Sequence, residues 1–264
     1  MKIVRFETAG ETSFGVLDPS TGEIREAAGD PFDGIRFTGR ERRLAEVRLL
    51  APVVPSKIVA VGLNYKDHAR EMGKRIPEEP LLFLKAPSAL NHPGGDVVYP
   101  RAAQRLDYEA ELAVVIGRVA KAVEEGDAPS AILGFTCIND VTARDLQVKD
   151  GLYARAKGFD TFAPLGPWIE TELDPSALRI RCLVNGEVRQ DGNSREMAAS
   201  AFRLVEFVSR IMTLFPGDVI ATGTPPGVGP VRVGDVMTVD VEGIGPLTNR
   251  VVAEVSMRKG ASRT

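Results

Sequence analysis

Three acidic residues alternate along one mostly apolar stretch of the sequence. Asp107, Glu109 and Glu111 lie two positions apart within Leu106–Ile116, whose length and composition make it the longest predicted strand. Because successive side chains of a strand point to opposite faces, the three carboxylates share one face, with about 7 Å between neighbours. Beyond Glu111 that face continues as apolar residues, so we expect it to be at least partly buried.

This carboxylate face has the chemistry of a divalent-cation site. Acidic groups on a half-buried face repel one another and lose hydration, and a bound cation is the simplest way to stabilise two or three of them. Hard oxygen ligands favour Mg²⁺, Mn²⁺ or Ca²⁺ over zinc. The best candidate for a further ligand is Asp140, which directly follows the apolar predicted strand Ile132–Ile138 and Asn139. The alternative is a solvated strand edge, with Asn139 and Asp140 as ordinary turn residues.

His68 and Glu71 form a second candidate group. The polar segment Asn64–Met72 is a candidate short helix, in which these two residues are three apart and face one another. A carboxylate beside an imidazole fixes its tautomer and raises its basicity, which makes a general base. Gly62 and Gly73 bracket the segment, so residues 64–73 also have the layout of a movable lid. The alternative is an ordinary pair on the surface of a helix.

Several other chemistries are excluded by the residues available. The two histidines, His68 and His92, cannot build a three-histidine zinc site, and Cys137 and Cys182 are too few and too far apart for a thiolate zinc site or a disulfide framework. We interpret His92 as a turn residue and Cys137 as inert core. The glycine-rich segment Thr222–Gly229 lacks the pattern of a phosphate-binding loop, although its hydroxyl and backbone N–H groups suit a carboxylate. The alternative interpretation of this glycine-rich segment is a purely structural loop.

Composition indicates a globular protein with a sizeable core. The chain has 264 residues, 44% of them hydrophobic, and a formal net charge of −3. That charge argues against nucleic acid or an anionic membrane as the main partner. The sequence contains no apolar run long enough for a membrane span and no signal-like start, so we expect a cytoplasmic protein.

The pattern of predicted elements favours an α+β, mainly β fold. Residues 1–52 are predicted to form a small β-rich domain and residues 53–264 a catalytic domain, with Val47–Pro55 as the linker between them. Ala201–Leu214 has the apolar spacing of an amphipathic helix. The remaining predicted strands, besides those above, are Lys2–Glu7, Phe14–Leu17, Lys57–Val61, Leu81–Leu84, Arg179–Val184, Val219–Ala221, Val236–Val241 and Leu247–Val255.

Taken together, five segments resemble the fumarylacetoacetate hydrolase family. They occur in the family's order and span about residues 57–255, and the small leading unit resembles the N-terminal domain of many bacterial members. The matching segments are Val61–His68 (VGLNYKDH), Asp107–Leu112 (DYEAEL), Gly134–Asp145 (GFTCINDVTARD), Lys157–Asp160 (KGFD) and Phe215–Gly229 (FPGDVIATGTPPGVG).

The resemblance implies a specific distribution of roles. It implies a core of rolled, mixed β-sheet, a homodimer, and Mg²⁺ or Mn²⁺ held by Glu109, Glu111 and Asp140. The substrate would be a small 2-oxo or 2-hydroxy acid that chelates this metal. The resemblance further implies that Lys157 would stabilise the developing enolate. The substrate would be contacted by Arg144, Gln147 and Thr224, with Thr222 as the alternative to Thr224. The lid would carry His68 and Glu71.

Several reactions share such a site, because each passes through a metal-bound enolate. The domain layout most resembles 2-hydroxyhepta-2,4-diene-1,7-dioate isomerases of aromatic catabolism, which act on a 2-oxo or 2-hydroxy-dienoic diacid. The alternatives within the family are an acylpyruvate hydrolase and an oxaloacetate-type decarboxylase. Alternatives of another class are a metal-dependent dicarboxylate-binding protein without turnover and a structural or interaction module.

Overall fold

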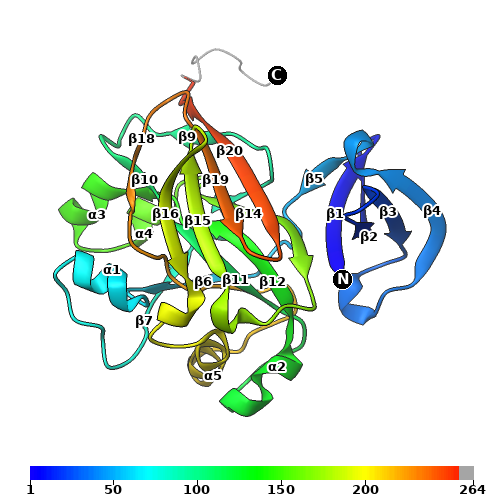
Figure 1. Cartoon of the computed structure of the whole chain (residues 1–264), viewed down its shortest axis with the longest axis horizontal. Coiled ribbons are helices and arrows are strands. Elements are labelled where there is room, and N and C mark those ends of the chain that lie inside the picture. The colour runs from blue at the N-terminus through cyan, green and yellow to red at the C-terminus, as the bar shows by residue number, and fades with distance from the viewer. Residues whose placement is uncertain (256–264) are drawn as a thin grey trace, which may run out of the picture.

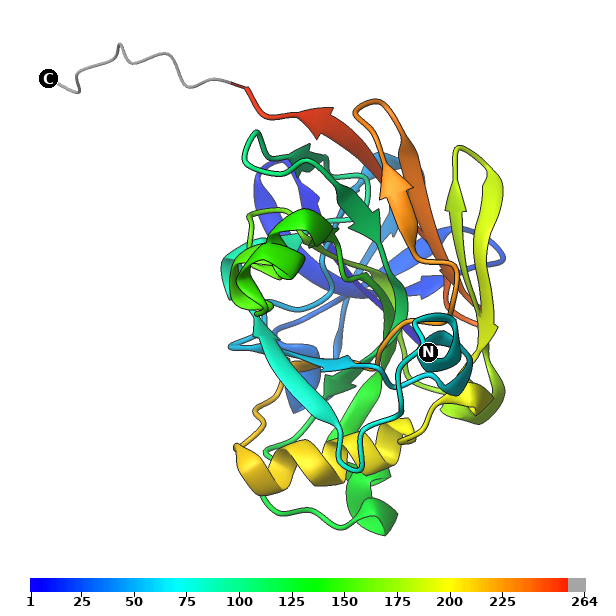
Figure 2. The same ribbon diagram turned by 90° about the vertical axis from the view of Figure 1, so that its left-hand side faces the viewer.

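Three β-sheets make up the body of residues 1–255, the part of the chain that the computed structural model describes (Figures 1 and 2). The largest sheet has twelve strands. In spatial order its path is β4 (Phe37–Arg43), β3 (Glu23–Ala27), β2 (Glu11–Asp18), β1 (Lys2–Thr8), β14 (Ala163–Glu170), β12 (Ile132–Asn139), β11 (Ala110–Ile116), β17 (Val219–Ala221), β6 (Ile58–Gly62) and β7 (Leu81–Lys85), with β5 (Arg48–Leu50) paired to β1 and β8 (Leu90–Asn91) to β14.

Two smaller sheets complete the strands of the described chain. The three-stranded sheet has the order β13 (Thr142–Ala143), β10 (Leu106–Tyr108) and β18 (Gly229–Val231). The five-stranded sheet has the order β16 (Glu187–Asn193), β15 (Arg179–Val184), β19 (Val236–Val241), β20 (Gly245–Ala253) and β9 (Val97–Tyr99). Most pairs are antiparallel, but β17–β6, β14–β8 and β20–β9 are parallel, so the sheets are mixed. The predicted mainly β, α+β fold class is therefore confirmed.

The middle of the large sheet is the best-buried part of the core. All seven residues of β11 are buried, as are the three of β17 and four of the five in β6. Both faces of these strands are apolar, which is why the sequence there reads as nearly continuous Val, Ile, Leu and Ala. The metal-ligand candidates lie at one end of this rigid region.

The short helices lie around the sheets in residues 1–255. They are α1 (Lys66–Glu71), α2 (Ala128–Ala131), α3 (Arg144–Asp150), α4 (Ala154–Lys157) and α5 (Ala201–Ile211). The side chain of Ser200 caps α5 by accepting a hydrogen bond from the backbone N–H of Arg203, and Leu204, Val205 and Val208 are buried on its apolar face. The helix ends three residues before the predicted Leu214. None of the helices in the described residues is long and apolar enough to cross a membrane.

The N-terminal strands β1–β5 form a unit beside the larger body, seen on the right of Figure 1. Strand β1 joins the two parts, because Lys2 and Ile3 pair with Glu170 and Ile169 of β14. The predicted linker Val47–Pro55 is wrong in its first half, since β5 lies there and pairs with β1. The predicted boundary between 52 and 53 stays a prediction, and residues 256–264 of the predicted catalytic domain lie outside the described residues.

The prediction of one continuous strand over Leu106–Ile116 is wrong. The segment is broken at Glu109 into β10 and β11, which belong to two different sheets, and the longest strand in the described residues is β20. Local alternation carries no information about such a change of sheet, because both halves keep an extended backbone. The break matters for the site, since Glu109 occupies it.

Candidate metal centre and substrate pocket

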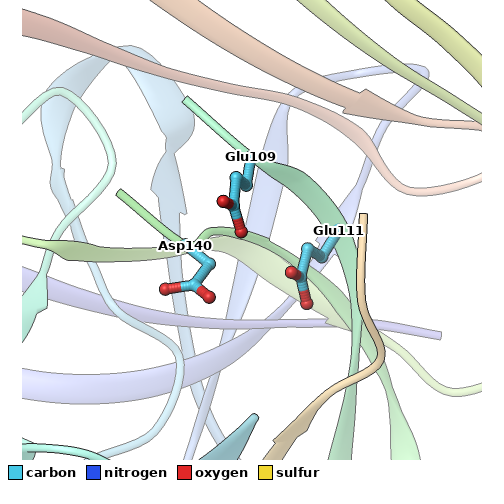
Figure 3. A group of neighbouring side chains, drawn as sticks. All are labelled: Glu109, Glu111 and Asp140. Atoms are coloured by element: carbon cyan, nitrogen blue, oxygen red, sulfur yellow. The ribbon is translucent and has the colours of Figure 1, made fainter. Parts of the chain in front are cut away.

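Glu109, Glu111 and Asp140 converge at the end of the central strands, with one carboxylate oxygen of each lying within 4.8 Å of the other two. Figure 3 shows the three side chains pointing toward a common space. The antiparallel pairing of β11 with β12 explains this convergence, because Ala110 pairs with Asn139 and thus brings Glu109 and Glu111 beside Asp140. The backbone N–H of Asp140 also donates to the carbonyl oxygen of Glu109 at 2.9 Å.

All three carboxyl groups are buried, and cationic side chains face two of them. The ammonium group of Lys157 donates to Asp140 at 2.5 Å and to Glu109 at 2.9 Å. Lys85, which is completely buried, donates to the other oxygen of Asp140 at 2.5 Å. Arg144 forms an ion pair with Glu109. The negative charge of the group is thus largely balanced within the protein.

The carboxyl groups differ in their electrostatic surroundings. Burial alone would raise the pKa of Glu109, but Lys157 and Arg144 outweigh it and hold the pKa at about 2. Burial, followed by repulsion from Asp140 and Glu109, raises the pKa of Glu111 well above its usual range. Glu111 accepts a hydrogen bond from the N–H of Gly223 at 2.8 Å. A positive charge beside Glu111 would therefore stabilise its carboxylate form.

The donor set fits a divalent cation. Three buried carboxylates supply hard oxygen ligands, which suit Mg²⁺ or Mn²⁺ better than softer metals, and one of them is held by a single backbone hydrogen bond. Glu109, Glu111 and Asp140 are the residues that would hold the ion. Asp107, the first acid of the predicted face, lies apart from this group. It is 1% exposed and forms ion pairs with Arg105 and Arg144.

The other predicted site residues lie mostly around one pocket. This pocket opens onto the three carboxylates and brings together residues from six segments of the chain. Its lining includes His68, Arg144, Gln147, Lys157 and Thr224, together with Lys74, Phe83 and Tyr153. Arg144 is oriented from two sides, because it pairs with Asp107 and donates to the side-chain oxygen of Gln147 at 2.6 Å. Glu71 is absent from the lining but contacts the lining residue His68.

His68 and Glu71 face one another as predicted from their spacing. Nδ1 of His68 lies 3.0 Å from the Glu71 carboxylate, and the imidazole is only 12% exposed. Within the described chain, Nε2 has no hydrogen-bond partner, so that nitrogen is left for a pocket ligand. The backbone N–H of Gly227 donates to Glu71 at 3.1 Å, which ties α1 to the segment 222–229. Through His68, the same helix contributes to the lining of the pocket.

The structure separates the two candidate threonines. Thr222 lies outside the pocket lining and donates its hydroxyl to the carbonyl of Leu112 at 2.9 Å. Thr224 lines the pocket, but its hydroxyl donates to the carbonyl of Ala110 at 2.9 Å and accepts from Gln190 at 2.8 Å. Because its one proton is already used, the Thr224 hydroxyl has nothing to donate to a substrate carboxylate. Any such contact therefore falls to its backbone N–H.

Three residues of the site were missed by sequence reasoning. Lys85 sits one residue beyond the predicted strand Leu81–Leu84, where a lysine reads as a solvent-exposed strand end. Gln190 and Lys74 lie in segments that carry no motif. A lysine at the end of an apolar strand is a weak signal, and only the fold brings Lys85 to Asp140, 55 residues away.

The remaining residues singled out from the sequence are placed away from the site chemistry. His92 accepts a hydrogen bond from the N–H of Ala51 at 3.0 Å, as befits a turn residue. Cys137 is buried, and burial raises the pKa of its thiol. Cys182 is buried as well, and both cysteines are free thiols.

Known families account for nearly all of this chain. Residues 57–252 match the family described as fumarylacetoacetate (FAA) hydrolase C-terminal, and residues 1–52 match one described as Rv2993c-like, N-terminal. The chain is 44% identical over 221 residues to oxaloacetate tautomerase FAHD2A, mitochondrial, of Homo sapiens. The aligned region covers 79% of this chain and 70% of the relative.

Two solved structures of similar proteins are informative. The structure of 2-hydroxyhepta-2,4-diene-1,7-dioate isomerase from Mycobacterium marinum is 44% identical, covers 97% of this chain and 100% of its own, and has a TM-score of 0.90. Maleylpyruvate hydrolase from Sphingobium sp. SYK-6, solved in complex with manganese(II) ion and pyruvate, is 30% identical, with 97% and 100% coverage and a TM-score of 0.80.

Proposed function

This chain belongs to the fumarylacetoacetate (FAA) hydrolase family, and we propose that it is a Mg²⁺- or Mn²⁺-dependent 2-hydroxyhepta-2,4-diene-1,7-dioate isomerase. The observation that carries the proposal is the convergence of Glu109, Glu111 and Asp140 in one pocket with Lys157 and His68. The similar isomerase of M. marinum, which matches over the full length, supports the choice of reaction. The family includes isomerases, a hydrolase and a tautomerase, so an enzyme is favoured over a module that only binds dicarboxylates.

A cation held by Glu109, Glu111 and Asp140 would supply a positive charge that favours the enolate form of the substrate. The chain's own residues do the rest. Lys157, whose charged form is favoured because Asp140 and Glu109 outweigh its burial and raise its pKa, places a fixed positive charge beside the developing enolate. Arg144, braced by Asp107, orients the acid end of the substrate together with Gln147.

Proton movement is assigned to His68. In the isomerisation the hydroxyl proton at C2 is lost and a proton is gained at C5, while the two C=C bonds become one C=O and one C=C. His68 lines the pocket, and Glu71 holds its Nδ1, which is the arrangement expected of a proton shuttle. No water is consumed in this reaction, so exclusion of water by α1 would favour it over hydrolysis.

Hydrolysis of an acylpyruvate is the first alternative reaction. In that case His68 would take a proton from water, the hydroxide would add to the acyl carbonyl, and the C–C bond would break to give a carboxylic acid and the enolate of pyruvate. The similarity to the maleylpyruvate hydrolase that was solved with manganese(II) and pyruvate favours this reading. The same carboxylates and the same histidine would serve it.

Reactions of oxaloacetate are the second alternative. The relative named oxaloacetate tautomerase in Homo sapiens favours interconversion of the keto and enol forms, which needs one proton moved between oxygen and C3. Decarboxylation would use the same enolate and is separated from tautomerisation by release of CO₂. Both would act on a shorter diacid than the isomerase substrate.

The test is a set of spectrophotometric assays on Mg²⁺-loaded protein with a 2-hydroxyhepta-2,4-dienedioate, acetylpyruvate and oxaloacetate. We expect a spectral change with the dienedioate that disappears with EDTA and in Glu109→Gln. Turnover of acetylpyruvate with release of pyruvate would replace isomerisation by hydrolysis, and turnover of oxaloacetate alone would replace it by tautomerisation or decarboxylation. Binding of all three without turnover would overturn the enzyme assignment.

Three further properties are proposed on the same footing. Residues 1–52 and 53–264 are proposed as separate domains, which limited proteolysis would test. A homodimer is proposed, and light scattering of the purified protein measures its mass directly. A cytoplasmic location is proposed from the sequence, and cell fractionation with an antibody tests it.

A further inference from the structure

The backbone between the two glutamates of the candidate metal centre lacks a partner strand on one side. Ala110 lies between Glu109 and Glu111, at the first position of β11. On one side β11 pairs with β12, but on the other β17 reaches only Ala113–Val115. The outward N–H and carbonyl groups of Ala110 are therefore beyond the end of the ladder. A buried backbone group in this position needs another partner.

Two side chains supply the missing partners. The N–H of Ala110 donates to Oε1 of Gln190 at 2.9 Å, and the hydroxyl of Thr224 donates to the carbonyl of Ala110 at 2.9 Å. Nε2 of Gln190 donates in turn to the Thr224 hydroxyl at 2.8 Å. These three hydrogen bonds close a ring around Ala110. A ring of this kind fixes the backbone more firmly than separate contacts to flexible groups.

Each polar atom of the Gln190 amide has a hydrogen-bond partner. Its second N–H donates to the carbonyl of Pro225 at 2.8 Å, and the residue is 1% exposed. Turning the amide over would place its NH₂ group against the N–H of Ala110 and its oxygen against the carbonyl of Pro225, so one orientation alone satisfies all partners. Both N–H groups and the oxygen of this side chain are thus engaged within the protein.

The ring also holds the segment that contacts Glu111. Thr224 and Pro225 lie beside Gly223, whose N–H donates to the Glu111 carboxylate at 2.8 Å. Gln190 itself belongs to β16, at the edge of the five-stranded sheet, whereas Glu111 belongs to the large sheet. One buried amide thus connects two sheets at the residue that lies between two carboxylates of the metal centre.

We propose that Gln190 is a positioning residue of the metal centre: its carboxamide fixes Ala110, and through it the relative placement of the Glu109 and Glu111 carboxylates. The inference rests on the proposed metal-dependent function. Groups that orient metal ligands from outside the coordination shell typically change metal affinity by about 10- to 100-fold when they are removed. Gln190 would act in this way through the backbone rather than by touching a ligand side chain.

The variant Gln190→Met tests this role, because it keeps the volume of the side chain and removes the three hydrogen bonds of its amide, to Ala110, Thr224 and Pro225. We expect Mn²⁺ to bind about 10-fold more weakly, measured by the loss of the free-ion signal in electron paramagnetic resonance. Thr224→Val breaks the same ring from the other side and serves if Gln190→Met does not fold. It is expected to weaken Mn²⁺ binding in the same direction.

Asn249 provides a matched control. Its side chain is 2% exposed, and its amide donates to the carbonyls of His92 and Gly95 at 2.9 and 2.7 Å, away from the metal centre. Asn249→Ala should lower the melting temperature and leave the Mn²⁺ affinity unchanged. Wild-type Mn²⁺ affinity in Gln190→Met, or equal weakening in Asn249→Ala, would overturn the positioning role. Failure of the wild type itself to bind Mn²⁺ would instead overturn the proposed function on which the inference rests.

Discussion

The carboxylate group and helix α1 face the same pocket but are built in opposite ways. Glu111 lies in the buried strand β11, and Glu109 and Asp140 directly adjoin the ends of β11 and β12, whose backbone pairing fixes all three positions. Helix α1 has six residues and no side-chain cap at its start, and three of its six residues are exposed. A helix this short has little stability of its own in water. Under the proposed function, metal binding therefore depends on the rigid part of the fold and proton transfer on a weakly held helix.

The contrast teaches which functions require a fixed geometry. Ligands of a metal must be held within a few tenths of an ångström, which a buried sheet achieves. A proton shuttle must approach a substrate that has first to enter, and local opening of a small helix allows entry. The Glu71–Gly227 hydrogen bond is the direct contact between α1 and the segment that also holds Glu111. Substitutions in the carboxylate group and substitutions in α1 should therefore have different experimental effects.

The largest effect is expected at the carboxylates. Glu109→Gln removes a charged ligand and leaves Lys157 and Arg144 with one carboxylate partner each, Asp140 and Asp107, so metal binding and turnover should both be lost. In the wild type, Mg²⁺ at about 100 times its Kd should stabilise the fold by about 2.7 kcal/mol, and this should vanish in the variant. Thermal melts with Mg²⁺ and with EDTA measure the difference. A metal-dependent shift of the melting temperature that persists in Glu109→Gln would contradict the assignment of metal binding to the buried carboxylates.

His68→Ala should have the next largest effect and a different signature. A general acid or base typically contributes about 10²- to 10⁴-fold to the rate, so kcat should fall by that amount. Mn²⁺ affinity and melting temperature should stay at wild-type values, because His68 lies on α1 and touches none of the three carboxylates. Weaker metal binding in this variant would show that the two regions are not independent.

Glu71→Ala sharpens the comparison within the helix. It removes the partner of the His68 ring and the contact to the N–H of Gly227, so we expect kcat to fall about 10-fold with little change in metal affinity. Glu78→Ala is the control, because this exposed acid lies on the following segment, outside the pocket. Equal loss of kcat in both variants would point to a general effect of charge on the segment.

The smallest effect is expected at the rim of the pocket. Lys74 lines the pocket and forms no ion pair within the described residues, so its ammonium group is placed to meet the distal carboxylate of a diacid. An exposed ion pair contributes up to about 1 kcal/mol, so Lys74→Met should raise KM about threefold for the dienedioate and leave that for acetylpyruvate unchanged. Arg75→Met, next in sequence but outside the lining, is the control. An equal rise in both variants would refute the assignment.

The sequence predicted the type of site better than its surroundings. The spacing of Glu109 and Glu111, and the position of Asp140 after an apolar strand, were sufficient to propose a cation site, because these signals are local. The position of most strands followed from apolar runs in the same way. In the N-terminal unit, β4 was missed because five of its seven residues are charged or glycine, and its structure comes from pairing with β3.

The features that sequence reasoning missed depend on contacts between distant segments. Lys85 meets Asp140 across 55 residues, and Gln190 meets Ala110 across 80. Neither residue has a periodic or motif signal, since a single lysine or glutamine in a strand is common on a solvated face. The break at Glu109 was missed for the same reason, because a change of sheet is decided by the strands on either side.

The cations that face the carboxylates have a thermodynamic consequence. Three acidic side chains, Glu109, Glu111 and Asp140, are buried beside three basic ones, Lys85, Lys157 and Arg144. A divalent ion entering this nearly neutral group leaves it with excess positive charge, and a substrate dianion restores the balance. Each should therefore bind more tightly in the presence of the other, and by linkage the two gains in affinity must be equal. The proposed function thus predicts cooperative binding of the cation and the substrate anion at this centre.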